Sequence, residues 1–347
     1  MLPDHDKALP LRSRRIFPLL GVLFLSVCGG GACGGAETTG AGGSSSTSST
    51  ASSASSTAST SEASSTSSAA SSSSSGTGGE PGVKVDRGPT AIPLDGDPNG
   101  LWWDSAAATL YIADDDNNRI LQWTDGGGVA LFANLPAAPP DGAGLGQLVK
   151  TKDGKIIVTR FGFGTAGDVV YVAPDKTTGN VPNLDPVRRR IGLTVASDGT
   201  LYDSYFVKTA NGQVGTVARL DLAGAETDFI PGLKKPVGVL ASGPSLFVSD
   251  QAAGTVSAAP IAMPDKLAVL AQVAGPDLLC EGPGGSLFTG STTGEVRQIA
   301  SDGKLSTFAG GFLQIRGVAY DAANKRVFAA EHDAAGSLNA LHILPVD

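Results

Sequence analysis

The chain has 347 residues, of which 25 are Lys or Arg and 33 are Asp or Glu, so its formal net charge is −8 at pH 7. An acidic chain whose longest basic run is the arginine triplet at 188–190 is a poor candidate for nucleic-acid binding, and no nucleic-acid partner is expected. Of its cysteines, Cys28, Cys33 and Cys280, only Cys280 lies beyond residue 82, so an internal disulfide is excluded there.

Residues 1–35 have the features of an export signal. Basic residues at 7, 12, 14 and 15 precede an apolar run at 16–27 that is too short to span a bilayer stably, and Cys28 follows directly. A basic end, a short apolar segment and a cysteine resemble a bacterial lipoprotein signal. In that family the cysteine becomes the lipidated first residue.

The lipidation site and the export route each have an alternative. Cys28 is favoured because it follows Leu25 and Ser26, whereas Cys33 has the small residue Ala32 before it. The arginine pair at 14–15 also resembles a twin-arginine motif, which leaves that route open beside the general one. An uncleaved anchor is the third interpretation of this segment.

Residues 36–82 form a low-complexity segment dominated by Ser, Thr, Ala and Gly. Such side chains are too small and polar to offset the entropy lost on folding, so a disordered linker is expected. The signal and linker together predict a membrane-anchored lipoprotein of the cell envelope, either periplasmic or at the cell surface. A lipid anchor would make the membrane a partner.

From residue 83 to 347 the chain repeats a unit of strand, turn, strand, polar loop and strand, often with a fourth strand. The units start near residues 99, 146, 191, 237, 277 and 316. A spacing of about 40–47 residues is typical of four-stranded propeller blades. The last unit ends after three strands, and residues 83–94 could supply its missing outer strand.

The sequence therefore predicts an all-β fold, a six-bladed β-propeller with four-stranded blades. No amphipathic helical pattern of useful length appears. An open sandwich of short strands is the competing fold, and the recurrence of the unit argues against it. The tryptophans Trp102, Trp103 and Trp123 are expected in the core or between blades.

The first unit also resembles known families. Asn99-Gly100-Leu101, followed by the segment 110–114, resembles the blade signature of the gluconolactonase/regucalcin family, and Asn118-Arg119-Ile120 is similar to the NHL repeat. The resemblance covers about 83–347 and is sharpest in this unit. It implies a propeller of six blades, or nearly six.

The resemblance also implies a metal site. Gluconolactonase-like enzymes hold a divalent metal with a Glu, an Asn before a Gly, and an Asp that opens an inner strand. Asn99 and Asp277 match the last two, which implies Ca²⁺ or another divalent cation as cofactor and Asp277 as the catalytic residue that activates water. The Glu has no convincing match, because its usual position would lie near residues 83–97, where the acidic residues are Asp86, Asp95 and Asp97.

Propeller geometry places two rings of residues on one face. The residues that open each first strand form an inner ring of Asn99, Gly146, Ile191, Val237, Asp277 and Arg316. The residues that close each second strand form an outer ring of Asp114, Arg160, Tyr205, Asp250, Ser291 and Glu331. The predicted ligand-binding residues are Asn99, Arg316, Asp114, Arg160, Asp250 and Glu331.

Several of these residues have a simpler interpretation. Asn99 could serve only as a turn former, and Asp114 and Asp250 could cap their own loops. Arg316 would repel a cation, so it fits better as an ion-pair partner of Asp277 or as a clamp for a substrate carboxylate. Glu331 and His332 could support acid–base chemistry, although a single surface histidine is usually inert.

Three functions remain open from the sequence. The first is a monomeric propeller that binds a small-molecule, peptide or glycan ligand on its top face. The second is a metal-dependent lactonase, and the third is a scaffold for protein partners. The sequence contains no Gly-X-Ser-X-Gly, HExxH or Cys-X-X-Cys motif, which argues against serine hydrolase, zincin and thioredoxin-like activities.

Overall fold

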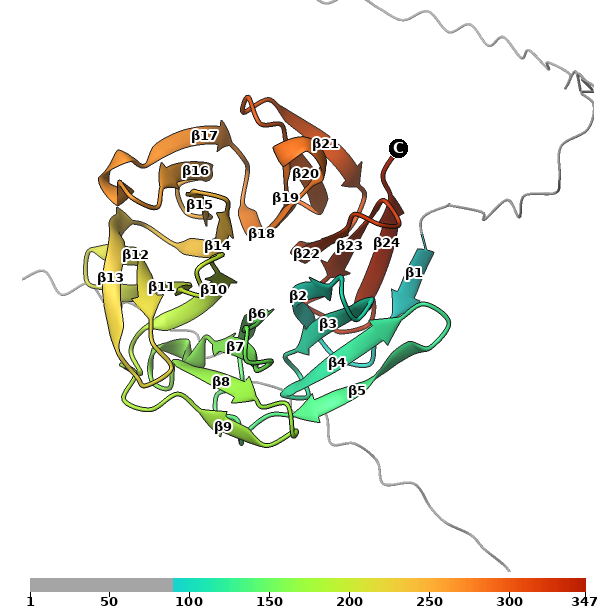
Figure 1. Ribbon diagram of the computed structural model, residues 1–347, viewed down its shortest axis with the longest axis horizontal. Helices are drawn as coiled ribbons and strands as arrows, with labels where there is room; N and C mark the ends of the chain where they lie inside the picture. The colour runs from blue at the N-terminus through green and yellow to red at the C-terminus, as the bar shows by residue number, and fades with distance from the viewer. Residues whose placement is uncertain (1–89) are drawn as a thin grey trace, which may run out of the picture. The chain divides into compact units, whose positions relative to one another are not determined.

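The computed structural model describes residues 90–347, which form six four-stranded antiparallel sheets arranged around a central axis (Figure 1). The predicted six-bladed β-propeller is confirmed. The export signal, the linker, Cys28 and Cys33 lie outside the described residues. Within 90–347 the helices are the 3-10 turns η1 (Gly162–Gly164), η2 (Pro264–Lys266) and η3 (Pro283–Gly285). None of these could cross a bilayer.

The first three blades run from the innermost to the outermost strand in chain order. The first contains β2 (Pro98–Asp104), β3 (Thr109–Asp114), β4 (Arg119–Thr124) and β5 (Gly128–Asn134). The second contains β6 (Leu145–Lys150), β7 (Ile156–Arg160), β8 (Asp168–Val172) and β9 (Thr178–Asn180). The third contains β10 (Arg189–Val195), β11 (Leu201–Thr209), β12 (Gly212–Leu220) and β13 (Glu226–Leu233).

The next two blades repeat this order, and the sixth departs from it. The fourth contains β14 (Pro236–Ser242), β15 (Ser245–Asp250), β16 (Thr255–Pro260) and β17 (Ala268–Gln272). The fifth contains β18 (Pro276–Glu281), β19 (Leu287–Ser291), β20 (Glu295–Ile299) and β21 (Leu305–Gly310). The sixth contains β22 (Ile315–Asp321), β23 (Arg326–Glu331), β24 (Ala340–Pro345) and, as its outer strand, β1 (Thr90–Pro93).

The ring closes through this outer strand. Thr90 pairs with Ile343 and Pro93 with Ala340, so β1 runs antiparallel to β24. The prediction that the segment before the first unit completes the last one is confirmed. Closure covers the edge of β24, which would otherwise present unpaired backbone groups.

The hydrophobic core is divided among the blade interfaces rather than gathered at the centre. Each of six buried clusters combines residues from two neighbouring blades. Both faces of each sheet are thus covered, and β3 is buried at every position, as expected for a strand packed on both sides. Trp123 and Trp103 pack with Phe328 between the first and sixth blades, which confirms their expected place.

Glycines near the start of the inner strands let adjacent blades approach closely. A Cβ on Gly100 would lie 2.3 Å from the carbonyl oxygen of Gly146, and one on Gly317 would lie 2.0 Å from that of Asn99. Any side chain there would push the strands apart. The Asn99-Gly100 pair therefore has a packing role, whatever its role in the site.

Candidate functional site

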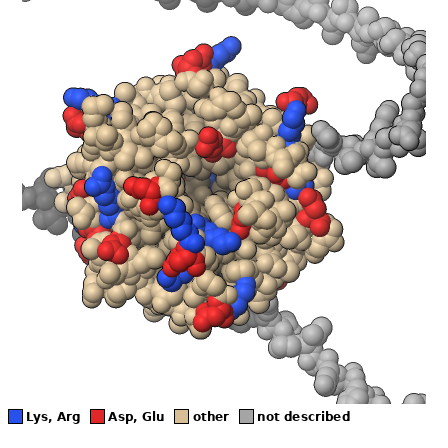
Figure 2. All heavy atoms as spheres, viewed as in Figure 1, with Lys and Arg blue, Asp and Glu red and all other residues tan. Residues whose placement is uncertain are grey.

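A pocket of about 240 Å³ opens where the inner strands begin. The space-filling view shows the centre of the ring hollowed, with basic and acidic side chains around it (Figure 2). All the predicted inner-ring residues line this pocket, namely Asn99, Gly146, Ile191, Val237, Asp277 and Arg316. Their convergence follows from the shared register of the first strands.

The predicted outer-ring residues are absent from the pocket lining. Instead Asp115, Phe161 and Gln251 line it, each one residue beyond a predicted position. Successive side chains along an extended chain point to opposite sides, so a shift of one residue reverses the direction. The structure thus places four predicted ligand-binding residues outside the pocket: Asp114, Arg160, Asp250 and Glu331.

These outer residues fasten the loop that leads into their own blade. The Asp114 carboxylate accepts a hydrogen bond from the backbone nitrogen of Asp97 at 3.1 Å. The Asp250 carboxylate accepts one from the backbone nitrogen of Lys235 at 3.0 Å. In their own loops, Asp250 also accepts from the backbone nitrogen of Ala253 at 3.1 Å and Asp114 from Asn117 Nδ2 at 3.1 Å, as the capping interpretation expects. Through Asp97 and Lys235 both residues also position side chains that reach the site.

Arg160 and Glu331 make contacts of the same kind. The buried Arg160 guanidinium donates to the carbonyl oxygen of Pro136 at 3.0 Å. The Glu331 carboxylate accepts from the backbone nitrogen of Leu313 at 2.8 Å and lies 2.7 Å from His342 Nε2. Both side chains hold connecting segments in place.

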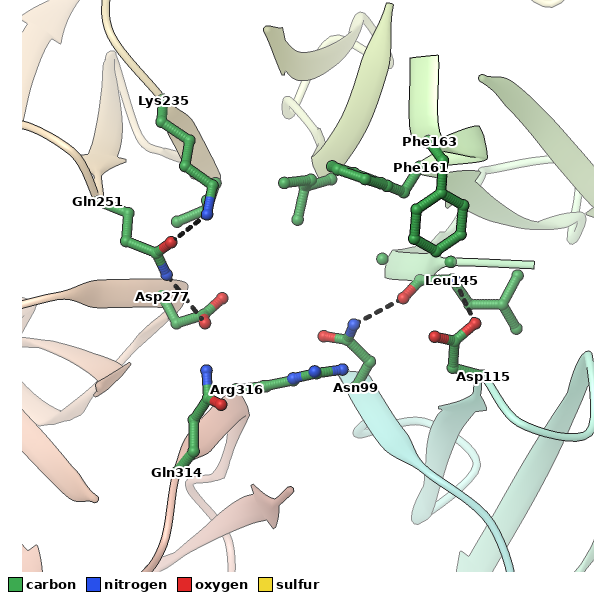
Figure 3. Close-up of a pocket in the computed structure, with 14 residues that line it drawn as sticks. Asn99, Asp115, Leu145, Phe161, Phe163, Lys235, Gln251, Asp277, Gln314 and Arg316 are labelled. Carbon is green, nitrogen blue, oxygen red and sulfur yellow. Dashed lines mark hydrogen bonds between the residues drawn. The ribbon is translucent and has the colours of Figure 1, made fainter. Parts of the chain in front are cut away.

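One wall of the pocket is a chain of polar contacts between Lys235, Gln251 and Asp277 (Figure 3). The ammonium of Lys235 donates to Gln251 Oε1, and Gln251 Nε2 donates weakly to Asp277 Oδ2 at 3.4 Å. Burial raises the pKa of Asp277 to about 7, against the opposing effect of nearby Arg316 and Lys235. Burial also lowers the pKa of Lys235.

Arg316 does not pair with Asp277, contrary to one sequence-based interpretation. Its Nη1 donates to Asp97 Oδ2 at 3.2 Å, and the other carboxylate oxygen of Asp97 lies 2.6 Å from His332 Nδ1. Asp97 and Arg316 are 219 residues apart in the chain. His332 therefore has a structural contact at the site, because it supports the carboxylate that orients the arginine.

Asn99 faces this wall from the first blade and is tied to the second. Its Nδ2 donates to the carbonyl oxygen of Leu145 at 2.7 Å, while the backbone nitrogen of Leu145 donates to Asp115 at 2.8 Å. Burial raises the pKa of Asp115, although the Leu145 hydrogen bond opposes this. With Nδ2 engaged, the Asn99 side chain presents its oxygen to the pocket (Figure 3).

The side of the pocket that adjoins the second blade is aromatic. Phe161 and Phe163 pack edge to face with ring centroids 5.2 Å apart. Phe163 is 42% exposed and has a φ of 52°, a left-handed conformation that is costly for a non-glycine residue. Such strain at a pocket mouth is typical of binding sites.

The residues present do not fit a divalent cation. Within residues 90–347 no group of three or more His, Cys, Asp or Glu side chains is gathered in a way that could hold a metal. The pocket offers the carboxylates of Asp115 and Asp277, and it sets Lys235 and Arg316 against them. A hard cation needs several oxygen ligands, so the metal role implied for Asn99 and Asp277 is not supported here.

The fold can be placed among solved structures. No family model and no curated protein matches the chain. A gluconolactonase from Xanthomonas campestris matches with a TM-score of 0.58 and 21% identity, over 73% of this chain and 87% of that one. Regucalcin from Agrobacterium tumefaciens, described as a calcium-binding protein, matches with a TM-score of 0.57 and 15% identity, over 72% and 90% of the two chains. A luciferin-regenerating enzyme matches with a TM-score of 0.59 and 12% identity, over 74% and 95%.

The chain shares its fold with gluconolactonase- and regucalcin-like propellers. At these identities the likeness establishes the architecture alone, because one fold carries many activities. The residues that the sequence-based interpretation missed are Asp97, Asp115, Phe161, Phe163, Lys235, Gln251 and Gln314.

Proposed function

We propose that the propeller binds a small molecule carrying a carboxylate in its central pocket. The observation that carries this proposal is Arg316, whose guanidinium reaches the pocket while Asp97 holds it through Nη1. A guanidinium has further donors, in a planar arrangement that matches a carboxylate. Lys235 adds a second positive charge to the lining.

The pocket suits a compact ligand. Its volume of about 240 Å³ falls below the ~300–1,000 Å³ of pockets for drug-sized molecules. The side-chain amides of Asn99, Gln251 and Gln314 add hydrogen-bonding groups, and Phe161 and Phe163 add an apolar surface. Polar and charged side chains on one side of the pocket and the two phenylalanines on the other would fix the ligand's orientation.

A titration can test the carboxylate. The probe is 3-phenylpropionate, and its uncharged alcohol 3-phenylpropanol is the comparison, both measured by calorimetry on the folded domain. Arg316→Gln is expected to weaken 3-phenylpropionate binding by about tenfold or more, because a charge-assisted hydrogen bond contributes ~1.5–3 kcal/mol. The alcohol should bind equally to both proteins.

The exposed Arg219, on the third strand of its blade, provides a matched control. Arg219→Gln should leave the affinity unchanged. The proposal fails if 3-phenylpropionate binds no better than 3-phenylpropanol while phenylalanine also fails to bind at millimolar concentration, or if both arginine variants weaken carboxylate binding equally.

A second candidate is hydrolysis of a lactone or a related ester. Asp277, with a pKa of about 7, could accept a proton from water near neutral pH, as a general base must. The gluconolactonase among the fold neighbours is consistent with this candidate. Lactone hydrolysis that is lost in Asp277→Asn, while carboxylate binding persists, would favour it over simple binding.

We also propose that the protein is exported and tethered to a membrane by a lipid at Cys28. The support is in the sequence alone, namely the basic end, the apolar run at 16–27 and the cysteine that follows. In a bacterial host fed a radiolabelled fatty acid, label should be lost in Cys28→Ala and kept in Cys33→Ala. The opposite pattern would move the site to Cys33, and unlabelled wild-type protein would contradict lipidation.

A further inference from the structure

We propose that the pocket selects a zwitterion, specifically an α-amino acid with an apolar side chain, whose carboxylate binds Arg316 and whose ammonium binds Asp277. This inference rests on the proposed carboxylate-binding function and names the class of its ligand. It follows from two opposite charges that share one pocket without pairing with each other.

Arg316 and Asp277 each have an incomplete set of partners. The ion pair of Arg316 is with Asp97, at 3.2 Å. Asp277 makes no ion pair within the described part of the chain, and its side-chain hydrogen bond is the 3.4 Å contact from Gln251. The pocket therefore presents an acceptor and a donor of opposite charge to whatever enters (Figure 3).

The burial of Asp277 makes an ammonium partner favourable. Its exposed fraction is 7%, so its negative charge has lost most of its hydration. A buried charge is costly unless a partner of opposite sign compensates it. A ligand that supplied a carboxylate alone would place a second negative charge beside this one.

The charged groups of the pocket lining also favour a zwitterionic ligand. Asp115 and Asp277 are balanced by Lys235 and Arg316, so the lining has two groups of each sign. Because Asp97 already pairs with Arg316 from behind, a simple anion would meet an excess of carboxylates, whereas a ligand that carries both charges also compensates Asp277. The ligand class therefore follows from how the charges are arranged rather than from their sum.

The apolar end of the ligand has a place opposite the charged wall. Phe161 and Phe163 approach the pocket from the second blade, while Asp277 and Arg316 belong to the fifth and sixth (Figure 3). Leu145 extends the apolar surface beside Phe163. An amino acid oriented by its two charged groups would direct its side chain toward these residues.

Two matched series of probes test the inference by calorimetry at pH 8. The first is phenylalanine, 3-phenylpropionate and 2-phenylethylamine, and the second is leucine, 4-methylpentanoate and 3-methylbutylamine. In at least one series the amino acid should bind about tenfold or more tightly than either analogue. Each analogue lacks one of the two charged groups, and a site built to bind a polar group discriminates strongly against a ligand without it. Asp277→Asn should remove this preference and should strengthen, not weaken, the binding of the two carboxylates, because the negative charge that repels them is gone.

Proton exchange in the wild-type protein gives a second readout that does not depend on a variant. The charged groups that act on Asp277 are Arg316, Lys235 and His332, with Gln251 as its neutral neighbour. At pH 7, an ammonium beside Asp277 should expel its proton, whereas an anion alone should promote proton uptake. Titrations in buffers of different ionisation enthalpy would show opposite signs for phenylalanine and 3-phenylpropionate.

The outcomes separate the two proposals. If 3-phenylpropionate and 4-methylpentanoate bind as tightly as the amino acids, the zwitterion inference is overturned and the carboxylate function stands. If the amines bind tightest, or if no compound of either series binds at millimolar concentration, both proposals are overturned. Proton uptake on binding phenylalanine would also overturn the inference.

Discussion

Replacement of Phe328 by alanine is expected to lower the free energy of unfolding by about 3–5 kcal/mol. Phe328 has no exposed surface, and its ring centroid lies 5.2 Å from those of both Trp103 and Trp123. The tryptophans belong to the first blade and Phe328 to the sixth, so the truncation would leave a cavity at the interface where the ring closes. Denaturant unfolding followed by tryptophan fluorescence would measure the loss.

Phe163→Ala is the matched control, because Phe163 is 42% exposed. A substitution away from the core usually changes stability by less than about 1 kcal/mol. Equal losses in the two variants would contradict the view that the closing interface is a main contributor to stability. An unchanged Phe328→Ala protein would contradict the packing itself.

Asp277 is expected to make the protein less stable as the pH rises from about 4 to 7. Burial raises its pKa in the folded protein to about 7 from an ordinary value of 3.8, so in this window the folded state holds a proton that the unfolded chain has released. The stability that Asp277 contributes is fully present below its pKa in the unfolded chain. It is lost as the pH rises through its pKa in the folded protein. The change is on the order of 4 kcal/mol at most.

The comparison with Asp277→Asn isolates this group. The buried carboxyl of Asp203 also has a raised pKa, caused chiefly by burial, but it is present in both proteins and cancels from the difference. Between pH 4 and 7 the unfolding free energy of Asp277→Asn should change less than that of the wild type. The control variant Asp302→Asn, at an exposed position, should show the same pH dependence as the wild type. Parallel profiles for wild type and Asp277→Asn would rule out the raised pKa.

The blades could be predicted from the sequence because their strands combine apolar residues with turns that favour tight reversal. The sequence predicts four strands for every blade but does not mark where the outer strand β9 of the second blade lies. Its residues are Thr178, Gly179 and Asn180, none of which carries a large apolar side chain. Backbone pairing with β8 forms this strand, and such pairing leaves no hydrophobic pattern to read.

The structure places the predicted inner-ring residues in the pocket lining and the predicted outer-ring residues outside it. An inner-strand start is marked by its position before a short apolar run, so its register can be read from the sequence. The end of a second strand carries no comparable mark, and an error of one residue reverses the side chain. The pattern therefore predicts Asp114 and Asp250, whereas Asp115 and Gln251 line the pocket.

By itself the sequence determined the number of blades, the strand that closes the ring and the residues that open onto its axis, because these follow from periodic patterns along the chain. Only the tertiary structure decided which charges pair. Asp97 holds Arg316 across 219 residues, and Asp277 is left with a 3.4 Å amide contact. Ion pairing depends on distances of a few ångströms between side chains from different blades, and no pattern in the chain encodes those distances.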